Sequence, residues 1–356
     1  MEGQPVVHIV HFYSSPGGIE LLSSRLLPSF SGYDFRVFVI RPPAEERENV
    51  YTGAVVPVQY GSLNNLTALC RLWRYARRHR EEIFHLFNLG PFYLLAVRLA
   101  GAANIVYGIH GTRYWKNRWQ RALHRPLWKL ALRKNVKITS NSEYSRSVFM
   151  KEVCGSARVT VLYNPVSNNR FVPSAERREQ RPLKIIYTGR LNRGKNLEKW
   201  IDIAVDLHEK LDRPVFEIYG SGPMERLLAA KIRTLGAESY ISLKGYRSDI
   251  ENVFRDADLL LFLSEYESFG NVVVESILCG TPVMVSDIPS MREIFRDYPL
   301  FLLESGGEIS GQVVSRLSDY DSLARAARIA GDDFRERFSE KNYIGQLKSI
   351  YNTFHE

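Results

Sequence analysis

Two kinds of hydrophobic pattern alternate along this chain. Short runs of consecutive apolar residues, typical of strands buried on both faces of a parallel sheet, alternate with longer stretches whose apolar residues recur at helical spacing. The runs predict strands over 6–12, 35–40, 83–87, 104–109, 136–139, 158–162, 183–187, 215–219, 240–243, 259–263 and 283–285. Helices are predicted over 19–27, 64–80, 91–99, 196–211, 224–235, 249–257, 290–296, 309–317, 321–331 and 340–354. This order indicates an α/β fold of parallel sheets.

One polar stretch, 174–181, interrupts the alternation and reads as a linker. A chain of 356 residues is also long enough for about two domains. We therefore predict an N-terminal Rossmann-like domain over 1–172 and a second one over 173–338. A C-terminal helix over 339–356 is expected to pack back on the first domain.

The composition is that of an ordinary globular protein and argues against a disulfide-rich or membrane-spanning one. The hydrophobic fraction of 45% and the charged fraction of 24% are those of an ordinary globular chain. Cys70, Cys154 and Cys279 are too few and too scattered for a disulfide framework or a zinc site. Neither a membrane-spanning apolar run nor a signal peptide is recognisable, so we expect a cytoplasmic protein, with possible placement on the inner face of the cell membrane left open.

The net positive charge of the chain comes entirely from its first half. Residues 1–170 hold 23 basic and 10 acidic side chains, a net charge of +13, whereas the whole chain carries only +9. An anionic partner is therefore expected there: a membrane surface, an anionic acceptor or nucleic acid.

The stretch 113–137 combines aromatic and basic residues at helical spacing. One interpretation is a helix that packs an apolar face, Trp115, Trp119, Leu123, Leu127 and Ala131, on the sheet. The other is a surface helix that lies among anionic lipid headgroups. Its candidate residues are Arg113, Trp115, Lys116, Arg118, Trp119, Arg121 and Arg125. Nucleic acid is not favoured, because no nucleic-acid-reading motif is recognisable.

Several predicted strands end in residues suited to ligand binding. Gly17 and Gly18 follow the first strand, His110 follows the strand over 104–109, and Arg190 with Lys195 follows the strand over 183–187. Ligands of open α/β sheets bind at the carboxyl ends of the strands. Two cations in a loop that opens a helix are suited to a diphosphate.

The stretch 261–287 contains two carboxylates on either side of a predicted helix start. Glu267 lies in the loop after a strand, and Glu275 lies on the helix that Phe269-Gly270 opens. A helix rise of 1.5 Å per residue places them about 10 Å or more apart, too far for the acid and nucleophile of a glycosidase. The Asp256-Ala257-Asp258 segment resembles a metal-chelating D-x-D, but it lies at the amino edge of the sheet and is interpreted as capping.

The chain resembles the retaining glycosyltransferases of the GT-B architecture, and within them the large family 4. The resemblance rests on the E-x7-E segment, Glu267 to Glu275, followed by Cys-Gly-Thr-Pro-Val-Met-Val-Ser-Asp, and on the order of the glycine, histidine and cation sites. It implies two Rossmann-like domains facing each other across a cleft. It further implies transfer of a hexose or N-acetylhexosamine from a nucleotide diphosphate sugar, UDP rather than GDP, to a glycan or lipid-linked acceptor in bacterial surface polysaccharide or lipopolysaccharide synthesis.

Roles follow from the resemblance residue by residue. Glu275 would hold the ribose, Arg190 and Lys195 the diphosphate, and Glu267 the sugar, with His110 near its C6 hydroxyl. The donor-binding set also contains Gly17, Gly18, Tyr246, Arg247, Phe269, Gly270, Asn271 and Val272. No cofactor and no metal are expected. The alternatives are a sugar-nucleotide epimerase of the same fold and a non-catalytic nucleotide-sugar-binding subunit.

Overall fold

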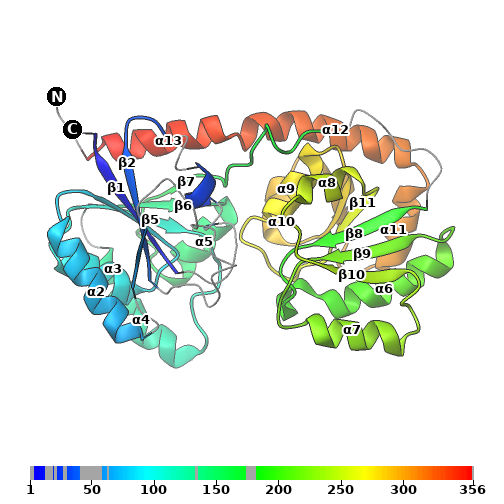
Figure 1. Cartoon of the computed structure of the whole chain (residues 1–356), viewed down its shortest axis with the longest axis horizontal. Coiled ribbons are helices and arrows are strands. Elements are labelled where there is room, and N and C mark those ends of the chain that lie inside the picture. Colours follow the sequence, from blue (N-terminus) through cyan, green and yellow to red (C-terminus); the bar gives the residue numbers. More distant parts are fainter. Residues whose placement is uncertain are drawn as a thin grey trace. The chain divides into compact units, whose positions relative to one another are not determined.

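The computed structural model describes residues 4–12, 19, 22–26, 30–40, 58–61, 64–132, 135–173 and 182–354. The chain forms two compact units, Met1–Pro165 together with Tyr343–Glu356, and Val166–Asn342 (Figure 1). These bounds differ by a few residues from the predicted 1–172, 173–338 and 339–356. The predicted linker, 174–181, and the pair Gly17-Gly18 lie outside the described residues.

The first unit is built on a seven-stranded sheet in the order β3-β2-β1-β4-β5-β6-β7, and all of its strand pairs are parallel. Its strands are β1 (Val6–His11), β2 (Asp34–Val39), β3 (Val58–Tyr60), β4 (Ile83–Phe87), β5 (Asn104–Ile109), β6 (Val136–Ser140) and β7 (Val159–Val161). The helical elements are the π-helix Leu22–Leu26, α2 (Asn65–Arg78), α3 (Pro91–Leu99), α4 (Arg118–Ala131), α5 (Glu143–Glu152) and α13 (Glu340–Asn352), most of which belongs here.

The second unit contains a six-stranded parallel sheet in the order β10-β9-β8-β11-β12-β13. Its strands are β8 (Lys184–Thr188), β9 (Val215–Tyr219), β10 (Ile241–Gly245), β11 (Leu259–Phe262), β12 (Val283–Ser286) and β13 (Leu302–Leu303). Its α-helices are α6 (Leu197–Lys210), α7 (Glu225–Thr234), α8 (Ile250–Arg255), α9 (Asn271–Leu278), α10 (Pro289–Ile294), α11 (Ile309–Leu317) and α12 (Tyr320–Arg337). Short 3-10 turns cover Arg193–Lys195 and Pro299–Phe301.

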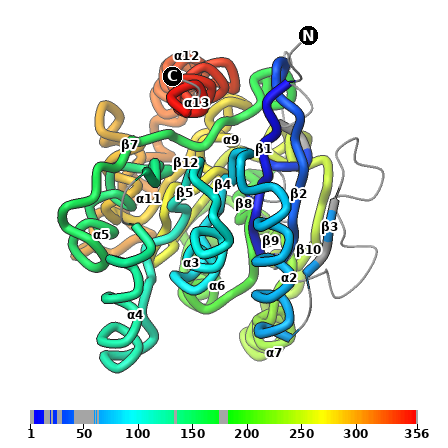
Figure 2. Tube along the Cα trace, turned by 90° about the vertical axis from the view of Figure 1, so that its left-hand side faces the viewer, coloured from blue at the N-terminus to red at the C-terminus, as the bar shows by residue number. Residues whose placement is uncertain are grey.

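Both units are Rossmann-like, as the sequence pattern predicts. Most of the described connections between successive strands contain a helix, and the central strands of each sheet are largely buried and rich in apolar residues, as expected of parallel sheets (Figure 2). In the second unit all four residues of β11 are buried, and Trp200 of α6 donates its indole N–H to the carbonyl of Leu261 at 2.9 Å. Side-chain caps at Asn64, Asn117 and Ser142 begin α2, α4 and α5.

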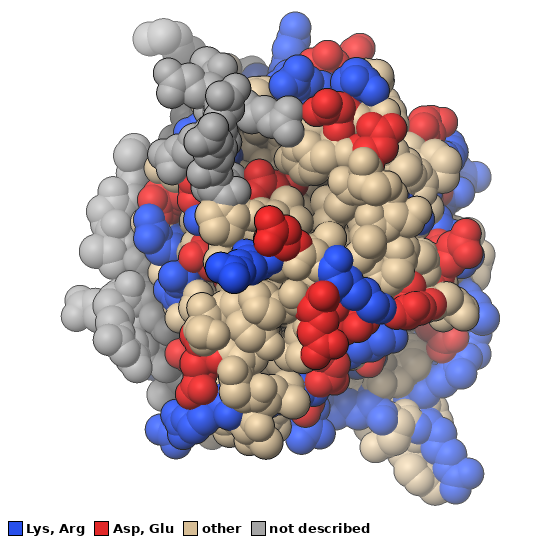
Figure 3. Space-filling view, turned by 90° about the vertical axis from the view of Figure 1, so that its right-hand side faces the viewer, with Lys and Arg blue, Asp and Glu red and all other residues tan. Residues whose placement is uncertain are grey.

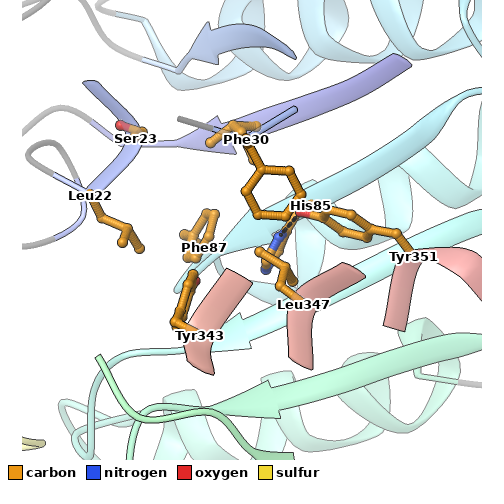
Figure 4. Close-up of a pocket in the computed structure, with 9 residues that line it drawn as sticks. Leu22, Ser23, Phe30, His85, Phe87, Tyr343, Leu347 and Tyr351 are labelled. Carbon is orange, nitrogen blue, oxygen red and sulfur yellow. Dashed lines mark hydrogen bonds between the residues drawn. The ribbon is translucent and has the colours of Figure 1, made fainter. Parts of the chain in front are cut away.

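The C-terminal helix packs into the core of the first unit. Tyr343, Leu347 and Tyr351 of α13 are buried against Ile9, Phe30 and the rest of an apolar cluster. They also line a small cavity of about 20 Å³, into which His85 of β4 projects (Figure 4). The hydroxyl of Tyr351 lies 2.7 Å from Nδ1 of His85, so a polar contact as well as apolar packing fixes α13.

Candidate functional site

The predicted donor-binding residues of the second unit gather where its strand order reverses. β8 pairs with β9 on one side and with β11 on the other, so the loops after β8 and β11 leave the sheet in opposite directions. Arg190 and Lys195 follow β8, and Glu267 follows β11. Such a switch point at the carboxyl edge is where open α/β sheets bind ligands.

Backbone contacts interlock the loops after β8, β9 and β10. Gly189 donates to the carbonyl of Tyr219 at 3.0 Å, and Gly220 donates to the carbonyl of Gly245 at 2.8 Å. The contact is so close that a Cβ on Gly220, which has φ +134°, would lie 1.8 Å from the carbonyl oxygen of Gly189. Glycine is therefore required at position 220, and the loops hold one another in place.

Lys195 and Glu267 form an ion pair at this edge. Nζ of Lys195 donates to Oε1 of Glu267, and both side chains are largely buried. The Ser264 hydroxyl lies 3.2 Å from the same Glu267 oxygen, and the lysine ammonium lies 5.4 Å from the centre of the Phe262 ring. These contacts fix the geometry of the pair.

Two contacts that the sequence did not indicate hold the Lys195 loop against the Glu267 loop. The amide of Glu265 donates to the carbonyl of Gly194 at 3.1 Å. The Tyr266 ring lies so close to Gly194 that a Cβ there would meet ring atoms at 2.3–2.4 Å. Only the Gly194-Lys195 dipeptide and the tyrosine before Glu267 hint at this contact in the sequence.

Arg190 is exposed at the same edge. Its guanidinium makes no hydrogen bond or ion pair with any described residue, while its carbonyl accepts from the Tyr187 hydroxyl at 3.2 Å. A fork of N–H donors on a fixed backbone can bind phosphate oxygens in bidentate fashion.

The start of α9 supplies backbone donors close to Glu267. Gly270 is the N-cap residue with φ +93°, and Phe269 is buried edge-on against Phe338, with ring centroids 5.2 Å apart. Asn271 and Val272 form the partly exposed first turn. The start of a helix favours anions through its dipole and its backbone N–H groups.

Glu275 lies four residues further along α9. Its carboxylate is only partly exposed and makes no hydrogen bond or ion pair with any described residue. Burial raises the pKa of Glu275 to about 7, and the Arg170 guanidinium only partly opposes this shift. A half-buried carboxylate without a partner can accept hydroxyl donors from a ligand.

The loop after β10 places Tyr246 and Arg247 at the same edge. Tyr246 is 58% exposed, whereas Arg247 forms a bidentate ion pair with Asp249 at 2.7 and 2.8 Å. The Tyr246 ring is therefore more available than the Arg247 guanidinium for stacking against a planar group of a ligand.

Asp256 and Asp258 have structural partners. Oδ2 of Asp256 accepts from Nζ of Lys184 at 2.6 Å, and Oδ2 of Asp258 accepts from the Lys184 backbone amide at 2.7 Å. Both carboxylates therefore connect the end of α8 to the start of β8.

His110 follows β5 in the first unit. Its ring lies edge-on to Phe87 with centroids 5.1 Å apart, and burial lowers its pKa to about 4. The imidazole is therefore neutral at physiological pH.

The structure corrects one of the two interpretations of α4. Trp119 and Leu123 do not pack on the sheet; they are 73% and 64% exposed, and Trp128 with Ala131 forms the buried contact instead. A spacing of four residues drifts around a helix of 3.6 residues per turn, so the predicted stripe does not stay on one face.

The residues around Trp119 are basic. Arg113, Lys116, Arg118, Arg121 and Arg125 are exposed, Arg118 lies over the Trp119 ring, and Arg121 pairs with Glu152 at 3.5 Å. Trp115 is half-buried against the core. The face of the molecule in Figure 3, in contrast, shows acidic and basic side chains side by side.

Two family models match the chain. The model described as Glycosyl transferases group 1 matches residues 169–342, which contain the Lys195, Glu267 and Glu275 edge. The model described as Glycosyltransferase Family 4 matches residues 16–170. Together the two matches span residues 16–342, and both models describe glycosyltransferases.

Similar glycosyltransferases include bacterial proteins matched over most of their length. The chain is 26% identical over 313 residues to EpsD of Bacillus subtilis (strain 168), whose name places it among the glycosyltransferases, covering 82% of this chain and 81% of EpsD. It is 22% identical over 308 residues to the UDP-Gal:alpha-D-GlcNAc-diphosphoundecaprenol alpha-1,3-galactosyltransferase of Escherichia coli, covering 82% and 76%.

Solved structures support the GT-B fold of this glycosyltransferase. The crystal structure of Anabaena HepE in complex with UDP and glucose matches with a TM-score of 0.79 and 19% identity, over 97% of this chain and 99% of HepE. In the described part of the chain, no helix is both long and apolar enough to cross a bilayer.

Proposed function

We propose that this glycosyltransferase is a retaining, metal-independent hexosyltransferase of family 4. It would transfer a hexose or N-acetylhexosamine from a UDP-sugar to a glycan or lipid-linked acceptor in bacterial surface polysaccharide or lipopolysaccharide synthesis. The observation that carries the proposal is the Lys195–Glu267 ion pair at the switch point; Arg190 lies in the same loop as Lys195, and Glu275 lies on the helix that follows Glu267.

The donor is held at four places along this edge. The ribose hydroxyls donate to the Glu275 carboxylate, which lacks a partner among the described residues. The diphosphate binds the Arg190 guanidinium, the Lys195 ammonium and the amides at the start of α9. The sugar hydroxyls meet Glu267, and Tyr246 offers a face for the base. The roles of Gly17, Gly18 and His110 stay predictions from the sequence.

Charge stabilisation drives the transfer. As the bond between the anomeric carbon and the diphosphate breaks, negative charge grows on the leaving oxygen, and Arg190 and Lys195 neutralise it without a metal ion. The leaving diphosphate accepts the proton of the acceptor hydroxyl on the same face of the sugar, so the anomeric configuration is retained. Glu267 orients Lys195 through the ion pair and forms no covalent bond to the sugar.

The first unit provides the argument for a lipid-linked acceptor and for contact with a membrane. Between Glu48 and Glu143 the only acidic residues are Glu81 and Glu82, so α4 presents Trp119 and Leu123 within a positively charged surface. Such a surface suits an anionic membrane, where a lipid-linked acceptor resides. The name of the Escherichia coli relative describes transfer from UDP-Gal to a diphosphoundecaprenol-linked sugar, which supports the same pairing of donor and acceptor.

Incubation with a panel of radiolabelled UDP- and GDP-sugars tests the proposal. Hydrolysis or transfer of a UDP-sugar in the presence of a chelator is expected, with the α-anomeric configuration of the donor kept in the product. Dependence on an added divalent metal, inversion, or a 2-epimerised nucleotide sugar as product would contradict it. Arg190→Ala should lose turnover, whereas Arg193→Ala, an exposed arginine in the same loop, serves as the matched control.

A further inference from the structure

Three potential metal ligands converge at the amino edge of the first unit's sheet, on the opposite edge from His110. They are His8 near the start of β1, His79 at the C-cap of α2, and Glu82 in the turn before β4. One ligand atom from each lies within 4.8 Å of the other two. Neither the donor site nor the basic surface of α4 uses these residues.

Strand pairing and a hydrogen-bonded turn bring the three side chains together. β1 and β4 pair directly, with His8 opposite Phe84, so His8 lies beside the turn that carries Glu82. The amide of Glu82 donates to the carbonyl of His79 at 3.0 Å, which fixes the turn. Nε2 of His8 contacts Oε2 of Glu82, and Nδ1 of His79 lies 3.3 Å from the same carboxylate.

The surroundings of His8 are those of an oriented ligand. Its imidazole is fully buried, and its Nδ1 lies 2.6 Å from the hydroxyl of Tyr75. Nε2 donates to the Glu82 carboxylate in the metal-free chain; when an ion replaces that proton, Nδ1 carries the ring proton and donates to Tyr75, and Nε2 presents its lone pair to the ion. Histidines that bind metals usually donate their second ring nitrogen in this way.

We propose that His8, His79 and Glu82 bind a zinc ion. Two histidines and one carboxylate, with a fourth position open to water, form one of the common zinc ligand sets. Two ligand atoms of a tetrahedral zinc ion at about 2.1 Å lie about 3.4 Å apart. The contact between His8 and Glu82 would therefore open to admit the ion, and separations of up to 4.8 Å would close by at most about 1.4 Å. The nearby Arg36 is paired with Asp34 at 3.3 Å, which offsets its repulsion of a cation.

The ion would join three elements, because each ligand comes from a different one. It would hold the start of β1 against the end of α2 and the entry into β4. Its distance in the fold from the carboxyl edge makes it a stabilising site rather than part of sugar transfer, so the proposal stands apart from the proposed function.

Calorimetric titration of the full chain with zinc chloride, after treatment with a chelator, tests this site. One zinc ion per chain is expected for the wild type. His79→Gln and Glu82→Gln should weaken binding at least roughly tenfold. Tyr75→Phe should weaken it about 10- to 100-fold, since it removes the hydrogen bond that orients a ligating histidine. His124→Gln and Cys70→Ser, which change a histidine and an exposed thiol elsewhere in the unit, should bind as the wild type does.

Thermal unfolding provides the second measurement. Zinc should raise the Tm of the wild type and of His124→Gln, and should leave the Tm of His79→Gln unchanged. His79 is partly exposed, so this variant is expected to fold. Absence of binding at micromolar zinc, or equal binding by wild type and His79→Gln, would overturn the proposal.

Discussion

Nζ of Lys195 donates to Oε1 of Glu267 across 72 positions of the sequence, and the two residues follow the adjacent strands β8 and β11. The lysine that is proposed to neutralise a diphosphate is therefore aimed by a carboxylate from the neighbouring loop. A ligand that binds here meets a charge already in position, which costs little reorganisation.

The first prediction concerns this ion pair. Lys195→Ala should lower kcat roughly 100- to 1,000-fold, the usual cost of removing one charge-stabilising donor. Glu267→Gln should also reduce kcat, because the lysine loses its orienting partner. Steady-state kinetics with a UDP-sugar measure both effects. Glu265→Gln, an exposed carboxylate two residues away, is the control, and an equal loss in that variant would count against the assignment.

A second prediction tests the contact between the two loops. In Gly194→Ala the new methyl group would collide with the Tyr266 ring, so the Lys195 loop must move. Overpacking of this kind costs about 1–3 kcal/mol of stability, and we expect reduced activity with it. A second substitution, Tyr266→Ala, removes the ring that the new methyl group would meet, and should restore part of the stability and part of the activity.

The control for this pair is Gly345→Ala in α13, where a Cβ would meet nothing within 4 Å. That change should stabilise the helix by about 0.5–1 kcal/mol. If Gly194→Ala behaves like Gly345→Ala in chemical unfolding and in turnover, the tight contact is not a constraint on the site.

The third prediction is a pH dependence of stability at Glu275. Its pKa is about 7 in the folded chain against an ordinary value of 4.5, so between these pH values the unfolded chain has released a proton that the folded chain keeps. Stability contributed by this residue is therefore complete below pH 4.5 and declines as the pH rises to 7, by at most about 3 kcal/mol.

Glu275→Gln removes this titration. The variant should gain stability over the wild type at pH 8 and show little difference at pH 5, as measured by urea unfolding at each pH. Donor affinity should change in the opposite direction, since a ribose prefers the ionised carboxylate: wild-type affinity for a UDP-sugar should rise between pH 6 and 8, and affinity of the variant should not. An identical stability difference at both pH values would argue against the raised pKa.

A fourth prediction addresses the exposed face of α4. Trp119→Ser with Leu123→Ser should reduce binding to vesicles that contain anionic lipid, because these side chains would lose their insertion into the interface. Raising the salt concentration should weaken what remains, since the arginines act through screened charges. Ile329→Ser, another exposed apolar residue, is the control in cosedimentation. Equal binding of all three proteins would exclude α4 as the membrane contact.

The sequence predicts the central strands well, because a strand buried on both faces must be a continuous apolar run. It does not reveal β3 or β13, which at three and two residues are too short for any pattern. It predicts which residues follow β8 and β11, yet the pairing of Lys195 with Glu267 and the contact of Gly194 with Tyr266 depend on strand order. In and before α4, Trp115, Trp119 and Leu123 recur every four residues, a spacing that predicts one buried face. Which of these side chains is exposed depends on how the helix packs on the sheet.

The close approach of Gly220 to Gly189 has a consequence for changing donor specificity. Because three loops at one edge of the sheet are joined backbone to backbone, an insertion or a grafted loop at any one of them would displace the other two. Exchange of individual side chains that project from these loops, with the loop lengths kept, is therefore the route by which a new donor preference can arise, in evolution as in the laboratory.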